Sequence, residues 1–181
     1  MLRRRRKVLM PGADDNTYEI CIMRHGLAAD RSIGQEDSRR PLTPEGKEKM
    51  QKIAAGLLKT GFTPACILSS PYVRAVETAR IVAEAIIPAP PLDRCEALQP
   101  GATPEDLVAF LSRHPEHKRV LLVGHEPDLS TLAARLTGAA RQARFGFKKG
   151  GCCLIEFDGF PPRPPGELVW WLTPRLLRKL A

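Results

Sequence analysis

The sequence predicts a single-domain, three-layer α/β/α sandwich with a mainly parallel central sheet and an antiparallel element near one edge. Two observations carry this prediction. Short apolar runs alternate with segments of helical periodicity, as they do in βαβ units. Near the end of the chain, two further apolar runs flank a stiff, proline-rich turn that is typical of a hairpin. At 181 residues, 43% of them hydrophobic, the chain is long enough to bury one full core.

Each predicted strand is a short apolar run bounded by polar or turn-forming residues. Three runs lie between helical segments, and the last two flank a turn that contains four prolines and two glycines. In chain order, the predicted strands are residues 18–23, 65–69, 120–124, 152–157 and 167–173. We expect the first three to be parallel and the last two to supply the antiparallel element.

Each predicted helix begins with a proline, which is tolerated at the first helical position, after a residue that can cap the free N–H groups. These pairs are Thr43-Pro44, Ser70-Pro71, Thr103-Pro104, Glu126-Pro127 and Thr173-Pro174. Apolar residues then recur at helical spacing, as at Met50, Ile53 and Leu57 in the first helix, and these faces are expected in the core. Residues 88–100 are expected to form a loop.

The formal net charge of +8 is concentrated at the ends of the chain, because residues 3–7 and 175–179 hold eight of the 28 Lys and Arg residues. We therefore divide the chain into a basic, flexible N-terminal arm, residues 1–17, and a folded domain, residues 18–181. Such an arm is usually solvated, and electrostatic contact with nucleic acid or anionic lipid is the alternative.

Composition also excludes several classes of protein. No run approaches the roughly 18 consecutive apolar residues of a membrane span, and the basic start is not followed by the apolar stretch of a signal peptide. We therefore expect a cytoplasmic protein that does not bind membranes. The five cysteines form an odd number with no Cys-x-x-Cys spacing, so we expect neither a disulfide framework nor a zinc site.

Two histidines directly follow predicted strands. His25 comes after the run 18–23 and Arg24, and His125 comes after the run 120–124. Because the carboxyl ends of parallel strands open onto a common crevice, we expect the two imidazoles to be neighbours. The run 65–69 leads into a helix whose first turn carries Arg74, which faces the same crevice. Two imidazoles and two arginines together predict a site for a phosphoryl group.

These residues belong to an ordered set of motifs. The set comprises Arg24-His25-Gly26, Arg39-Arg40-Pro41-Leu42-Thr43, Ser69-Ser70-Pro71 with Arg74, Glu77 and Thr78, and Gly124-His125-Glu126-Pro127. From about Tyr18 to Thr173, the chain resembles the phosphoglycerate mutase-like histidine phosphatase superfamily, and specifically its small phosphohistidine phosphatases of the SixA type.

The resemblance implies that His25 is the nucleophile that receives the phosphoryl group. It also implies that the phosphoryl oxygens are bound by Arg24, Arg74 and His125. Further substrate-binding residues are expected to be Arg40, Gly26, Ser70 and Asp37. Arginine forks and an imidazole can neutralise the charge of phosphoryl transfer without a metal, so we expect no metal or cofactor. Beside two arginines and a phosphate, His125 is interpreted as a cation that donates to oxygen.

Two acidic residues are candidates for the general acid that protonates the leaving group. Larger relatives carry an acidic residue on the loop after the second helix, and Glu96 occupies about that place. Asp37 is the competing candidate, and either residue could equally be a surface carboxylate. An alkyl phosphate ester needs such an acid, whereas phosphohistidine is already labile, so an unassigned acid favours P–N substrates.

The leading hypothesis is a metal-independent phosphatase that acts on protein phosphohistidine, such as that of a phosphorelay component, through a phosphohistidine intermediate on His25. An open crevice suits a phosphorylated side chain on another protein, and phosphate or another oxyanion is expected to fit it. One alternative is a phosphatase of small phosphate monoesters or nucleotides with the same mechanism. Another is a module that binds phosphoryl groups without turnover.

Overall fold

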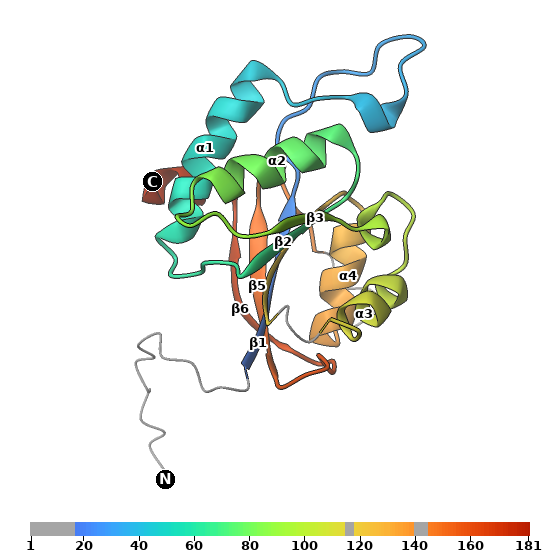
Figure 1. Ribbon diagram of the computed structural model, residues 1–181, viewed down its shortest axis with the longest axis vertical. Helices are drawn as coiled ribbons and strands as arrows, with labels where there is room; N and C mark the ends of the chain where they lie inside the picture. The colour runs from blue at the N-terminus through green and yellow to red at the C-terminus, as the bar shows by residue number, and fades with distance from the viewer. Residues whose placement is uncertain (1–16, 115–117, 140–144) are drawn as a thin grey trace.

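The computed structural model describes residues 17–114, 118–139 and 145–181. Six strands form one sheet in the order β3-β2-β4-β1-β5-β6 (Figure 1). The strands are β1 (Thr17–Arg24), β2 (Cys66–Ser69), β3 (Leu92–Arg94), β4 (Arg119–Gly124), β5 (Cys152–Asp158) and β6 (Glu167–Leu172). The helices are α1 (Pro44–Leu58), α2 (Val73–Glu84), α3 (Pro104–Leu111), α4 (Asp128–Thr137) and α5 (Pro174–Leu180), with short 3₁₀ helices η1 (Asp37–Arg39) and η2 (Glu96–Leu98).

The sheet is parallel at its centre, as the sequence predicted. β4 pairs in parallel with both β1 and β2, and β3 pairs in parallel with β2. β5 is antiparallel to both of its neighbours, β1 and β6. The antiparallel element therefore lies beside the β6 edge, where the proline-rich turn placed it.

Helices cover both faces of the sheet. α1, α2 and α5 pack with Cys21 and Met23 of β1, whereas α3 and α4 pack with Ile20 and Ile22 of the same strand. Alternate residues of a strand point to opposite faces, so this division shows that β1 is buried on both sides. Figure 1 shows α1 and α2 together on one face and α3 and α4 on the other. The three-layer α/β/α prediction is confirmed.

Three of the five predicted helices begin where the sequence predicted, and the predicted residue caps each of them. The hydroxyls of Thr43, Thr103 and Thr173 accept hydrogen bonds from backbone N–H groups in the first turns of α1, α3 and α5. α2 and α4 begin slightly later than predicted, at Val73 and Asp128.

Two further differences from the sequence prediction concern residues 88–100 and the end of the N-terminal arm. Residues 88–100, expected to be a loop, contain β3 and η2, because a three-residue edge strand is too short to show a periodic pattern. Thr17, assigned to the arm, is the first residue of β1. The rest of the predicted arm lies outside the described residues. No helix in the described ranges is long and apolar enough to cross a membrane.

Candidate active site

The site lies at the carboxyl ends of β1, β4 and β2. Arg24 ends β1, His125 directly follows β4, and Ser70 directly follows β2. The ring centroids of His25 and His125 are 5.0 Å apart. Strand order therefore brings together imidazoles that are one hundred residues apart in the sequence, as predicted.

The hydrogen bonds of His25 define its tautomer. Its Nδ1 lies 2.7 Å from the carbonyl oxygen of Gly26, which can only accept, so Nδ1 carries the proton. The lone pair is then on Nε2, to which Arg74 Nε donates at 3.2 Å. The nitrogen able to attack phosphorus thus faces the guanidinium that would bind the phosphoryl group.

Burial keeps His25 neutral. The side chain is 6% exposed, and its burial lowers its pKa to about 3. The hydrogen bond to Gly26 acts in the opposite direction, whereas a protonated His125 and the positive charges of Arg74 and Arg24 would lower the pKa further. At neutral pH the imidazole is therefore uncharged, the form that a nucleophile needs.

Arg74 is buried, and Asp37 of η1 orients it. Its NH1 donates to the Asp37 carbonyl at 2.7 Å, and its NH2 pairs with Asp37 Oδ2 at 2.8 Å. Arg40 Nε pairs with the other carboxylate oxygen, Oδ1, at 2.8 Å. Partial burial raises the pKa of Asp37, but the bonds and charges of the two arginines lower it overall. An ionised, doubly paired Asp37 is poorly suited to donate a proton, and it acts instead on the position of Arg74.

Two polar nitrogens in the site are buried without a hydrogen-bond partner among the described residues: Arg24 Nε and His125 Nδ1. The other end of Arg24 is fixed, because NH1 donates to the Phe147 carbonyl at 2.7 Å. Burial also lowers the pKa of Arg24. Buried polar groups are normally paired, so these two nitrogens indicate a place for an anionic ligand.

The charge of His125 depends on whether an anion is bound. Burial, followed by the positive charge of Arg74, lowers its pKa to about 4, so it is neutral at pH 7 when no anion is bound. Its Nε2 is hydrogen-bonded to Ser70 Oγ at 2.8 Å, and the ring meets Tyr72 edge-on at 5.1 Å. A cationic His125 requires the charge of a bound phosphoryl group to raise its pKa again.

Gly26 and Thr78 connect the segment that carries His25 to α2. The N–H of Gly26 donates to Thr78 Oγ1 at 3.0 Å, and that hydroxyl donates to the Arg74 carbonyl at 2.6 Å. A Cβ at Gly26 would lie 2.7 Å from Met50 Cγ of α1, so the close packing here favours glycine. Gly26 therefore serves the site through its backbone.

Glu96, the other candidate for the general acid, is the first residue of η2. Its side chain is exposed and accepts a hydrogen bond from the Gln99 amide. The neighbours Ala97, Leu98 and Gln99, rather than Glu96, line a cavity that His125 also borders. This geometry disfavours Glu96 as the general acid.

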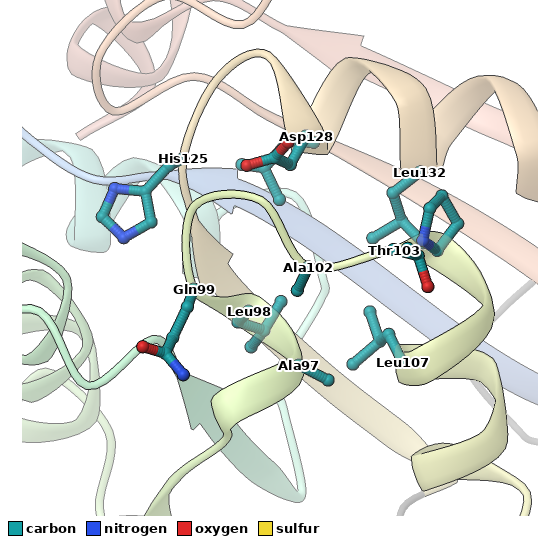
Figure 2. A pocket seen from close by; sticks show the side chains of 11 residues that line it. Ala97, Leu98, Gln99, Ala102, Thr103, Leu107, His125, Asp128 and Leu132 are labelled. Atoms are coloured by element: carbon teal, nitrogen blue, oxygen red, sulfur yellow. The ribbon is translucent and has the colours of Figure 1, made fainter.

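Sequence reasoning missed the residues around this cavity (Figure 2). It encloses about 270 Å³ of empty space, part of it open to solvent. Gln99 follows η2, and Asp128 opens α4 three residues after His125. The position of Asp128 after a strand-ending histidine was a usable signal, whereas the residues around η2 carry no periodic pattern.

Among the residues that the structure describes, no group of three or more His, Cys, Asp or Glu side chains could hold a metal ion. The arrangement at the strand ends is instead that of a neutral nucleophilic imidazole among cationic and hydrogen-bonding groups. Such a site can accept a phosphoryl group from a donor and transfer it to water.

Comparison with known proteins identifies the superfamily to which this chain belongs. Residues 20–99 match the model of the histidine phosphatase superfamily (branch 1). An uncharacterized protein of Picosynechococcus is 36% identical over 136 residues, which cover 74% of this chain and 81% of the relative. The chain therefore belongs to the histidine phosphatase superfamily.

Solved structures show which members it resembles. The protein histidine phosphatase SixA, solved in complex with tungstate, superposes with a TM-score of 0.75 at 25% identity, over 88% of this chain and 99% of that one. A mycobacterial glucosyl-3-phosphoglycerate phosphatase superposes with a TM-score of 0.64 at 18% identity, over 87% and 99%. The chain is thus a phosphatase-superfamily protein of the small SixA type.

Proposed function

We propose that this protein is a metal-independent phosphatase that removes the phosphoryl group from protein phosphohistidine through a covalent intermediate on His25. The observation that carries the proposal is the protonated Nδ1 of His25, which leaves Nε2 as the nucleophile beside Arg74. A neutral imidazole attacks phosphorus readily and also leaves it readily, so the reaction divides into two lower barriers.

The cationic groups supply the stabilisation that phosphoryl transfer needs. Arg24 and Arg74 flank the nucleophile, and His125 gains a proton when the charge of the substrate raises its pKa. Preorganised donors of this kind stabilise the spread charge of the transition state. The unpaired nitrogens of Arg24 and His125 support the same assignment.

The placement of the two candidate acids favours a substrate with a P–N bond, whose leaving group needs no proton donor. Asp37 is held ionised by two arginines, and Glu96 is exposed and hydrogen-bonded to Gln99. An alkoxide would need a proton donor that neither residue is placed to supply, whereas imidazole does not. We therefore place phosphate monoesters second, and propose a phosphohistidine-bearing cytoplasmic protein, such as a phosphorelay component, as the substrate.

The direct test measures phosphate release by the wild type and by His25→Ala, with a chelator present. The two substrates are a phosphohistidine-bearing protein and an alkyl phosphate monoester. We expect fast release from the phosphoprotein alone and a loss to background in the variant, with the melting temperature as a control for folding. Preference for the ester would move the function to small-molecule phosphates, and near wild-type activity of His25→Ala would remove the nucleophile assignment.

A further inference from the structure

The cavity beside His125 is lined mainly by apolar residues and one carboxylate. It lies between η2, α3 and the start of α4, and Leu98, Leu107 and Leu129 give it an apolar wall. Among the described residues that line it, Asp128 is the one acid, and there is no Lys or Arg. A carboxylate here attracts a group that presents a hydrogen-bond donor, such as an N–H.

Asp128 is held at this cavity by the backbone. The N–H of Leu129 donates to the His125 carbonyl at 2.9 Å, so a tight turn carries Asp128 back beside His125. The N–H of Gly101 donates to Asp128 Oδ2 at 3.0 Å and fixes the carboxylate. A carboxylate has acceptor capacity at both oxygens, so Asp128 can receive a further hydrogen bond. Figure 2 shows Asp128 and His125 at the same cavity, with Gln99 and Leu98 from the η2 side.

We propose that Asp128 binds the distal N–H of the leaving imidazole and thereby makes the site selective for phosphohistidine, an inference that rests on the proposed function. Phosphohistidine carries phosphorus on one ring nitrogen and a proton on the other when it is activated to leave. His25 Nε2 forms a bond to phosphorus while the P–N bond of the substrate breaks. The bonding electrons pass to the substrate nitrogen, and the ring departs as neutral imidazole with its distal proton in place.

The enzyme's own histidine shows the same arrangement. His25 holds a proton on Nδ1 through the Gly26 carbonyl, so the phosphorylated His25 also leaves as neutral imidazole when water attacks. Asp128 would accept a hydrogen bond from the distal N–H of the substrate ring, as the Gly26 carbonyl accepts one from Nδ1 of His25. A proton already present on the distal nitrogen replaces the general acid that an ester needs.

The lining of the cavity agrees with an imidazole ring. The apolar wall suits the faces of an imidazole, and the carboxylate suits its edge.

The test compares leaving groups with and without a distal N–H. The substrates are a phosphohistidine-bearing protein and phosphoramidate, whose leaving nitrogen is ammonia and has no second ring nitrogen. Asp128→Asn keeps the size of the side chain and an acceptor for Gly101, and removes the negative charge. We expect the ratio of kcat/KM for phosphohistidine to that for phosphoramidate to fall about tenfold or more, as for loss of a charged hydrogen bond.

Glu105→Gln is the matched control. Glu105 lies in the first turn of α3, pairs with Arg135 at 3.2 Å and does not line the cavity, so this variant should keep the wild-type ratio. Turnover of para-nitrophenyl phosphate reports whether each variant is folded and retains its nucleophile. An unchanged ratio in Asp128→Asn, or an equal fall in both variants, overturns the role of Asp128. A wild type that hydrolyses phosphoramidate but not phosphohistidine instead overturns the proposed function.

Discussion

Arg74 joins His25, the proposed nucleophile, to Asp37. One nitrogen of its guanidinium donates to His25 Nε2, and the other two contact Asp37. Lysine would keep the positive charge but could not make these three bonds in a fixed plane. The consequences of this geometry can be tested by substitution at Arg74 and at its partner.

Arg74→Ala should lower kcat/KM by about 10³-fold or more, because an arginine that stabilises the transition state of phosphoryl transfer contributes on that scale. Arg74→Lys should recover only part of the loss. Steady-state kinetics on the phosphohistidine protein measures both effects, with thermal unfolding as the folding control. A loss of only tenfold in Arg74→Ala would place this arginine outside the group that binds the phosphoryl oxygens.

Asp37→Asn distinguishes an orienting role from an acidic one. If Asp37 positions Arg74, its substitution should reduce turnover of an alkyl phosphate and of para-nitrophenyl phosphate by the same factor, about tenfold for the loss of a charged hydrogen bond. A general acid would matter more for the alkyl ester, since its leaving group is the poorer one. A markedly larger loss with the alkyl ester would restore Asp37 as the acid.

At the scale of residues, the sequence predicted the positions better than the protonation states. The sites of His25, Arg74 and His125 follow from strand ends and a helix start, which leave clear patterns. Their charges depend on burial and on neighbours brought together only by folding. Burial lowers the pKa of His125 to about 4, so the cationic form that was expected beside a phosphate depends on the charge of a bound anion. Glu96 was chosen by its place in the chain, but the chain turns its side chain toward solvent.

At the scale of elements, helix starts were predicted best where a threonine directly precedes the proline. Thr43, Thr103 and Thr173 all cap as expected. Ser70 and Glu126 lie further from the first residues of their helices. Their side chains accept from the nearby N–H groups of Tyr72 and Ser130, and they also bond His125 and the Phe147 N–H, which lie far away in the sequence. A local rule for helix caps does not predict these long-range partners.

Glu126 links α4 to the segment that holds Arg24. Its Oε1 accepts from the N–H of Phe147 at 2.6 Å, and the carbonyl of Phe147 accepts from Arg24 NH1. Glu126→Ala should therefore lower the free energy of unfolding by about 1–3 kcal/mol, the cost of a buried group left unpaired. It should also raise the KM, because Arg24 loses its support.

Urea unfolding and steady-state kinetics measure these two effects, and Glu126→Gln, which can still accept through its amide oxygen, should show smaller ones. The exposed Glu105→Gln serves as the control. An unchanged KM in Glu126→Ala, in a folded protein, would show that Arg24 is positioned without this link.

At the scale of the whole molecule, the alternation of strands and helices sufficed for the three-layer fold, because both faces of a parallel sheet must be covered. The order of the strands was not predictable in full. β3 leaves no periodic signal, and its place beside β2 depends on contacts between backbone segments. The position of β5 between β1 and β6 likewise depends on long-range pairing.

The two buried histidines make the stability of the whole fold depend on pH. The folded-state pKa values, about 3 for His25 and about 4 for His125, lie below the ordinary value of 6.5. At pH values between the folded-state pKa and 6.5, the unfolded chain binds more protons than the folded protein does. The free energy of unfolding is therefore highest above pH 6.5 and decreases as the pH falls below it. When the pH is lowered from 7.5 to 5, each histidine should decrease the free energy of unfolding by about 2 kcal/mol.

Urea unfolding at the two pH values measures this loss, and His125→Gln isolates one contribution to it. Glutamine does not titrate, so the variant should lose about 2 kcal/mol less than the wild type over the same interval. Bound phosphate should also reduce the loss, because an anion beside His125 raises its pKa toward the unfolded value. An equal pH dependence in the wild type and in His125→Gln would mean that the imidazole is protonated in the fold at pH 5, and that the cationic form is available before the substrate binds.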